Sequence, residues 1–161
     1  MTDHLTSRIW TMQAIYIALA LVIIYARLLP LDNQAGPWAA PDLLVALTFA
    51  WALRRPDYVP AYCVAGVLLL ADLLLLRPPG LMAALVLLGK VGLQRRQRDI
   101  REMGYPLEWL TVSATLGAIL ICERVVLGVF MVPQVSLGQS VIQVFITALF
   151  YPVVVLISET L

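Results

Sequence analysis

The sequence predicts an all-α membrane protein, a bundle of six transmembrane helices in a single domain. Hydrophobic residues make up 61% of the 161 residues and charged residues 13%, and the mean hydropathy is +0.90. Soluble globular domains carry about 25% charged residues. Because each helical crossing takes roughly 20 residues, we expect residues 1–161 to form one integral membrane domain without a separate soluble part.

Turn-forming residues divide the apolar sequence into six predicted spans. Pro30 ends the first run, the segment 54–56 (Arg-Arg-Pro) ends the second, and the segment 77–80 (Arg-Pro-Pro-Gly) ends the third, because proline and glycine favour turns. The second and fourth runs are short for a membrane crossing, so whether they cross fully stays open, and the second could be re-entrant. The predicted spans are residues 9–29, 38–53, 58–76, 79–93, 107–132 and 138–157.

The basic residues predict the orientation of the chain. If the N-terminus is cytoplasmic, seven arginines lie on the cytoplasmic side, and only Arg27 and Arg77 border the outer side. Short cytoplasmic loops are enriched in Lys and Arg, so this bias predicts a multi-pass protein with both termini in the cytoplasm. The seven are Arg8, Arg54, Arg55, Arg95, Arg96, Arg98 and Arg101.

Four of these arginines, Arg95, Arg96, Arg98 and Arg101, form a predicted cytoplasmic basic loop. Fixing the topology and contacting anionic lipid headgroups are sufficient roles for such a loop, although a cytoplasmic partner could also dock there. Aromatic residues are not interleaved with the arginines, so the pattern gives no support for nucleic-acid binding.

Charged residues inside the apolar runs are the main candidate functional residues. A carboxylate at Asp72, flanked by leucines on its C-terminal side, is too costly to face lipid and must face protein or water. In the predicted topology, Asp42, Asp72, Glu123 and Arg124 all lie toward the outer side. We predict that these four residues, with Arg27 and Arg77, form a buried or water-lined ion-pair network, because unpaired charges at that depth are costly.

Three basic residues also have a simpler interpretation. Arg27 and Arg77 stand near the outer ends of their runs, and Lys90 stands about one turn from the cytoplasmic end of its run. Long basic side chains can bury their methylene groups and extend the charge to the headgroups. We therefore expect Arg27, Arg77 and Lys90 to reach the membrane interface.

Two helix faces are candidates for contacts between helices. Small residues allow transmembrane helices to approach closely, and polar side chains can bond between helices. Either face could pack inside the bundle or against another membrane protein, and internal packing alone explains each equally well. The fifth span carries Ser113, Gly117 and Gly128 on the face of Arg124, and the sixth span carries Gln139, Gln143 and Thr147.

The residues predict neither an enzyme nor a cofactor or metal site. The single histidine, His4, precedes the first span, so acid–base or metal chemistry that depends on histidine lacks its side chain. Cys63 and Cys122 lie in apolar runs, where free cysteines pack as small hydrophobes. The sequence also lacks a phosphate-binding glycine loop and a nucleophile elbow.

Several short motifs carry a family resemblance. They are Pro41-Asp42-Leu43-Leu44, Ala52-Leu53-Arg54-Arg55-Pro56, Ala71-Asp72-Leu73-Leu74, Pro79-Gly80-Leu81 and, at the start of the fifth span, Tyr105-Pro106-Leu107-Glu108-Trp109. Together with the chain length and the number of spans, these motifs resemble the bacterial rod shape-determining MreD family. Members commonly show a Pro-Asp-Leu opening, an arginine-proline cytoplasmic turn and an aspartate before a Pro/Gly turn.

The resemblance implies a non-catalytic scaffold subunit of the cell-elongation complex, which synthesises peptidoglycan and sets rod shape, in the bacterial inner membrane. Such subunits bind the membrane protein MreC and, through it, associate with MreB, RodA and a class B penicillin-binding transpeptidase. The family is similar in fold to the substrate-binding components of energy-coupling-factor vitamin transporters, which are six-helix bundles. A small-molecule-binding subunit of a membrane transporter is therefore the alternative.

Overall fold

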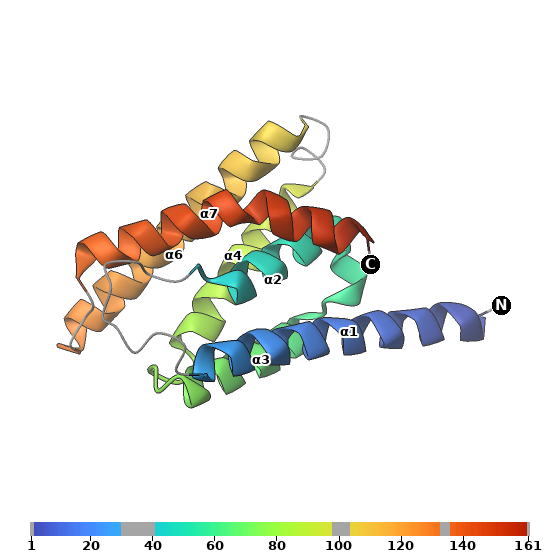
Figure 1. Ribbon diagram of the computed structural model, residues 1–161, viewed down its shortest axis with the longest axis horizontal. Coiled ribbons are helices and arrows are strands. Elements are labelled where there is room, and N and C mark those ends of the chain that lie inside the picture. Colours follow the sequence, from blue (N-terminus) through green and yellow to red (C-terminus); the bar gives the residue numbers. More distant parts are fainter. Residues whose placement is uncertain (1, 30–40, 98–103, 133–135, 161) are drawn as a thin grey trace.

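The computed structural model describes residues 2–29, 41–97, 104–132 and 136–160, without the side chains of residues 2–7, 57 and 158–160. These residues form six α-helices and one short 3-10 helix (Figure 1). The α-helices are α1 (Thr2–Leu28), α2 (Leu43–Arg54), α3 (Ala61–Leu74), α4 (Leu81–Arg95), α6 (Tyr105–Val129) and α7 (Leu137–Thr160), and η1 (Pro56–Tyr58) joins α2 to α3. The predicted all-α class is confirmed for the described residues.

Each of the six predicted spans overlaps one of these helices, although only α3 lies wholly within its predicted bounds and α1 begins well before them. Three of them, α1, α6 and α7, are long and apolar enough to cross a membrane, and α2 and α3 are shorter apolar helices. This arrangement is that of a multi-pass helical membrane protein. The 12 residues of α2 extend about 18 Å, which is less than the hydrocarbon thickness of a bilayer. Crossing by all six helices stays a prediction.

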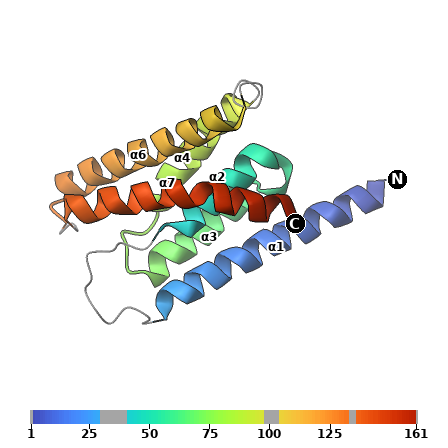
Figure 2. The same cartoon turned by 45° about the horizontal axis from the view of Figure 1, so that its top comes forward.

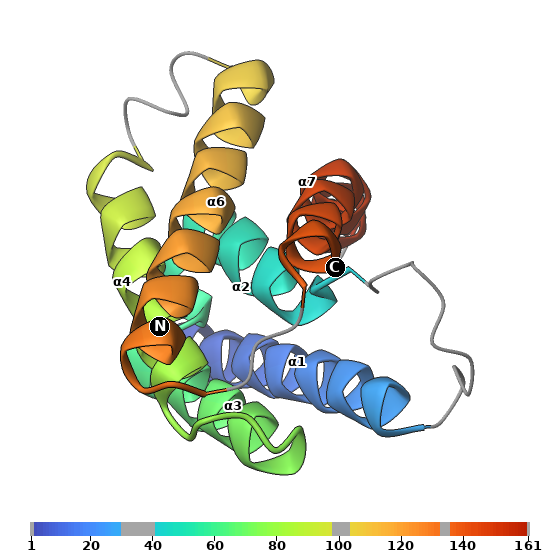
Figure 3. The same ribbon diagram turned by 90° about the vertical axis from the view of Figure 1, so that its left-hand side faces the viewer.

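Helix α2 lies in the middle of the bundle, with the other helices around it (Figure 3). All ten residues from Leu44 to Leu53 are buried, and α2 contacts α1, α4 and α7. A helix that is apolar on every side is stable only where every side is covered. Because protein and not lipid surrounds α2, this helix does not need the length of a membrane span.

The remaining helices form two groups on either side of α2. Helices α1 and α3 pack together on one side, while α4, α6 and α7 cover the other, and α3 also contacts α4 (Figure 2). Both chain termini lie toward the end of the bundle where α2 ends and η1 begins (Figure 1). The opposite end holds the end of α1 and the start of α2, and we call it the Asp42 end.

Gly89 permits a close approach between α4, α2 and α6. A Cβ atom at this position would lie 3.1 Å from Phe49 Cζ, 3.1 Å from Thr115 Cγ2 and 3.3 Å from Ile119 Cδ1. Overpacking of a core costs about 1–3 kcal/mol. We therefore expect Gly89→Leu to lower the free energy of unfolding by about that amount, as measured by circular dichroism during unfolding in mixed micelles.

Gly92, on the same helix, provides the matched control. A Cβ atom at Gly92 meets nothing within 4 Å, so Gly92→Leu should leave the free energy of unfolding within about 0.5 kcal/mol of the wild type. Equal losses for Gly89→Leu and Gly92→Leu would show that the helix backbone, and not the close contact, sets the cost.

Candidate functional site

Asp42 is the centre of a cluster of charges that joins several helices. Its Oδ1 lies 3.6 Å from the NH2 of Arg27 at the end of α1, and its Oδ2 lies 3.8 Å from the NH1 of Arg77, between α3 and α4. Its backbone N–H donates to Thr147 Oγ1 of α7 at 2.8 Å. Asp42 also caps α2, because its Oδ1 accepts the N–H of Val45 at 3.4 Å.

These contacts correct the expectation that Arg27 and Arg77 extend to the lipid headgroups. Both guanidinium groups are turned inward to Asp42, and Arg27 also donates to Pro41 O at 2.7 Å. The exposed fraction is 19% for the Arg27 side chain and 30% for Arg77. The buried carboxylate draws the two cations in, because its own burial without a positive partner would be costly.

Asp72 has a different role from Asp42. It is buried, and its Oδ2 accepts the backbone N–H groups of Gly80 at 3.1 Å and Ala83 at 3.4 Å. The first N–H groups of a helix have no partner within that helix, so Asp72 of α3 caps the start of α4. The chain turns there through Gly80, whose φ of +87° is a conformation that glycine adopts without strain.

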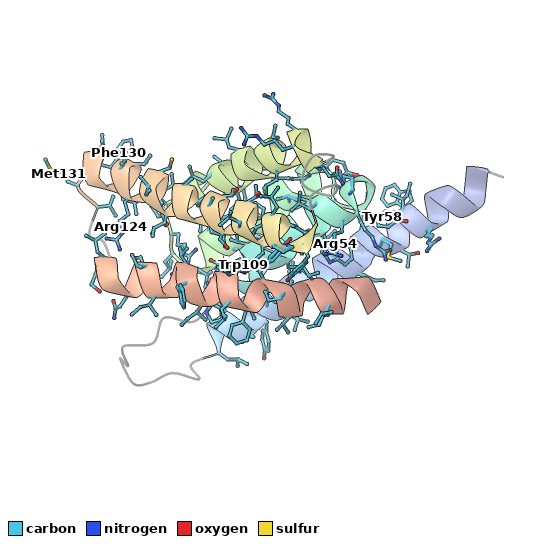
Figure 4. The ribbon with its side chains drawn as sticks, turned by 90° about the horizontal axis from the view of Figure 1, so that it is seen from above. Arg54, Tyr58, Trp109, Arg124, Phe130 and Met131 are labelled. Atoms are coloured by element: carbon cyan, nitrogen blue, oxygen red, sulfur yellow. The ribbon has the colours of Figure 1, made fainter. Side chains whose placement is uncertain are left out.

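Arg124 joins α6 to α7 at the Asp42 end. It donates to Ser136 O at 3.1 Å and also to Ser140 Oγ. Further along the same pair of helices, Trp109 Nε1 donates to Ala148 O at 2.7 Å. Figure 4 shows Arg124 and Trp109 between α6 and α7, well separated along the helices. These contacts hold α6 and α7 side by side.

A cavity of about 380 Å³ lies between α2, α4, α6 and α7 at the Asp42 end. Four residues of the predicted network, Asp42, Arg77, Glu123 and Arg124, line this cavity together, whereas Arg27 and Asp72 do not. The predicted polar stripe of α7 faces the same space, so it is turned to the inside of the bundle. The polar lining residues are Asp42, Arg77, Glu123, Arg124, Gln139, Ser140, Gln143 and Thr147.

The small-residue face of α6 is only partly used within the chain. Arg124 on this face contacts α7, and Ser113 Oγ donates to Trp109 O of its own helix at 2.8 Å. A Cβ atom at Gly117 would meet nothing within 4 Å, and Gly128 is exposed. Gly117 itself is half-buried, but α6 has room for a side chain at this position.

A second buried cluster, at the other end of α2, was not predicted from the sequence. Arg54 NH2 lies 3.3 Å from Glu108 Oε2, and Tyr151 O–H donates to Glu108 Oε1 at 2.8 Å. This Glu108 cluster joins α2, α6 and α7. One signal in the sequence could have indicated it, because Arg54 ends one apolar run and Glu108 begins another on the same predicted side of the membrane. Nothing singled out Tyr151.

Lys90 also differs from its expectation. Its side chain is buried, with 3% of the residue exposed, and its Nζ donates to Val59 O. The connection between α2 and α3 covers the ammonium group, so it bonds to a backbone carbonyl and does not reach the headgroups. In the predicted basic loop, Arg95 and Arg96 are exposed at the end of α4, and Arg98 and Arg101 lie outside the described residues.

Comparisons of this chain with protein-family models, curated proteins and solved structures found no match. The site therefore has to be interpreted from its own geometry. Within the described ranges, no group of three or more His, Cys, Asp or Glu side chains is placed to hold a metal ion.

The geometry offers two kinds of binding surface. The cavity presents charges of both signs and side-chain amides beside apolar residues such as Leu116 and Ile119, a combination that is typical of small-molecule sites. The outer face of α6 presents exposed apolar side chains, such as Ile121 and Val125, next to the half-buried Gly117. Such a face suits lipid or a second transmembrane helix.

Proposed function

We propose that this chain is a non-catalytic scaffold subunit of the bacterial cell-elongation complex, which binds an MreC-like membrane protein through its transmembrane helix faces. The observation that carries the proposal is the small-residue face of α6, where a Cβ atom at the half-buried Gly117 would meet nothing within 4 Å. Small residues on an exposed face let a partner helix approach closely, and close packing drives helix association in lipid. The motifs between residues 41 and 81 resemble those of the MreD family, and this resemblance is the reason for naming the cell-elongation complex.

The contacts of the motif residues support this proposal. Asp42 binds Arg27 and Arg77, Asp72 caps α4, and Arg54 binds Glu108. All three motif residues therefore bond to groups of this chain and fix how its helices lie against one another. A scaffold needs such internal bonds, because a partner helix recognises outer faces only where they are held in a fixed arrangement.

In this proposal the protein lies in the inner membrane with both termini in the cytoplasm. The exposed Arg95 and Arg96 then face the cytoplasm, in agreement with the usual distribution of basic residues, and the Asp42 end faces outward. Association with MreB, RodA and a class B penicillin-binding transpeptidase is indirect and passes through the MreC-like partner.

Co-purification with an MreC-like protein from native membranes tests the proposal. We expect Gly117→Leu to reduce the amount of co-purified partner by about tenfold, because loss of close helix packing costs on the order of 1–2 kcal/mol. The Cβ atom at Gly117 meets nothing within the chain, so the variant should fold as the wild type does.

Gly66→Leu is the matched control for this experiment. Gly66 lies on a helix, α3, where it is exposed, and, as at Gly117, a Cβ atom there meets nothing within 4 Å. Co-purification of the Gly66→Leu variant should equal that of the wild type. A wild-type chain that never co-purifies with an MreC-like protein would remove the scaffold proposal, whereas equal loss in both variants would remove α6 as the partner face.

A second candidate function is favoured by one observation, the charged cavity at the Asp42 end. A small-molecule-binding subunit of a membrane transporter would hold its ligand in such a space. This function predicts a bound small molecule where the scaffold function predicts a partner protein. Ligand analysis and co-purification therefore test the two candidates separately.

A further inference from the structure

We propose that the cavity at the Asp42 end binds a zwitterionic molecule, with an ammonium group held by Glu123 and an anionic group, phosphate or carboxylate, held near Arg77. This inference deepens the second proposed function by naming the chemistry of the ligand, and it does not depend on the scaffold function. It is carried by the size of the cavity, the balance of its charges and the surroundings of Glu123.

The cavity has the size and lining of a small-molecule site. Its volume of about 380 Å³ falls in the range of ligand pockets, roughly 300–1,000 Å³. Apolar side chains, Leu116, Ile119, Leu120 and Val144 among them, line the space together with the polar residues. A ligand with an apolar body and a polar head matches both parts of the lining.

The charges that line the cavity balance. Two carboxylates, Asp42 and Glu123, and two guanidinium groups, Arg77 and Arg124, line the cavity. Arg27 and Asp72, which lie next to Asp42 outside this lining, add one charge of each sign, so the formal charges sum to zero. A ligand with a net charge would bring an uncompensated charge into a space of low dielectric constant, which is unfavourable. A ligand that carries one positive and one negative group keeps the balance and can pair with both kinds of side chain.

Glu123 indicates where the positive group of the ligand lies. The Asp42 carboxylate is already occupied by Arg27, Arg77 and the N–H of Val45. The half-buried Glu123 carboxylate, in contrast, makes no direct hydrogen bond or ion pair with a described residue. The guanidinium groups of Arg77 and Arg124 attract it without direct contact, while Asp42 and Asp72 repel it. A carboxylate at this depth in a membrane protein requires a donor or a cation, and a primary ammonium group supplies both.

The other wall of the cavity suits the anionic group. Arg77 contributes a guanidinium group, and Gln139 and Gln143 of α7 contribute side-chain amides. Guanidinium and amide N–H groups are good donors to phosphate and carboxylate oxygens. The same chemistry is found in the headgroup of a phosphatidylethanolamine lipid and in a free zwitterion, so the experiment has to separate these two sources.

Native mass spectrometry of the detergent-purified chain with three probes tests the inference. The probes are phosphatidylethanolamine, its soluble headgroup glycerophosphoethanolamine, and the anionic lipid phosphatidylglycerol. We expect phosphatidylethanolamine to bind at least about tenfold more tightly than phosphatidylglycerol. Glu123→Gln should weaken phosphatidylethanolamine binding by about tenfold to a hundredfold, the usual loss for a charge-assisted hydrogen bond. The same substitution should tighten phosphatidylglycerol binding, because it leaves the cavity with one uncompensated positive charge.

Two controls separate ligand binding from folding. Without a probe, Glu123→Gln should unfold at the same temperature as the wild type or above it, because the substitution removes a charge that has no ion-pair partner among the described residues. Arg95→Gln, which removes an exposed charge from the other end of α4, should bind phosphatidylethanolamine as the wild type does.

Each outcome decides something different. Displacement of the lipid by glycerophosphoethanolamine supports a free zwitterion as ligand, and binding only of the intact lipid supports the lipid headgroup. Equal binding of phosphatidylglycerol, or full binding by Glu123→Gln, overturns the zwitterion while leaving ligand binding by the bundle in place. Failure of all three probes overturns the zwitterion, whereas the second proposed function fails only if analysis of the purified chain also finds no bound small molecule.

Discussion

Asp42→Ala is expected to lower the free energy of unfolding by about 3–5 kcal/mol, because removing one partner of a buried ion pair leaves the other charges uncompensated. The substitution leaves Arg27 and Arg77 facing inward without their shared carboxylate. It also removes the cap that accepts the N–H of Val45 at the start of α2. Unfolding in mixed micelles, followed by circular dichroism, measures the loss.

Two further variants separate charge from shape at Asp42. Asp42→Asn keeps the volume and an oxygen that can accept the N–H of Val45, so it should lose less stability than Asp42→Ala. Arg27→Ala should cost at least about 1 kcal/mol less in the Asp42→Ala background than in the wild type, because residues in direct contact are energetically coupled. Independent, additive losses for Arg27→Ala and Asp42→Ala would contradict the ion pair.

Glu108→Ala is expected to have the second-largest effect, a loss of about 3 kcal/mol or more in the free energy of unfolding. Glu108 accepts from both Arg54 and Tyr151, and the removal of a buried carboxylate withdraws the shared acceptor from a cation and a hydroxyl group. Glu108→Gln keeps an oxygen for the Tyr151 hydroxyl and should lose less. The same unfolding measurement applies.

The effects of Asp42→Ala and Glu108→Ala should add. The Asp42 cluster and the Glu108 cluster lie at opposite ends of α2, about 18 Å apart along the helix axis, and their charged side chains do not contact one another. Losses at distant sites usually add within about 0.5 kcal/mol. A double variant whose loss falls clearly short of the sum would indicate that one substitution alone already unfolds the bundle.

Composition and turn residues were sufficient to predict the helices. The apolar runs end at Arg because its charge is costly in hydrocarbon, and at Pro and Gly because these residues interrupt a helix. Each predicted run overlaps one helix in the structure. The sequence also indicated that Asp72 could not face lipid, since the cost of exposing a carboxylate to hydrocarbon depends on the residue type and on its apolar neighbours. Asp72 is indeed buried in protein.

Only the tertiary structure decided which group each charge binds. The sequence places Arg27, Asp42 and Arg77 at a similar depth, but their pairing depends on how α1, α2 and the start of α4 meet. Nor could it show that the polar stripe of α7 faces an internal cavity, because a stripe looks the same whether it faces its own bundle or a partner. The hydropathy pattern predicts which segments lie inside the membrane. The direction in which a side chain points around its helix axis is set by the helices packed beside it.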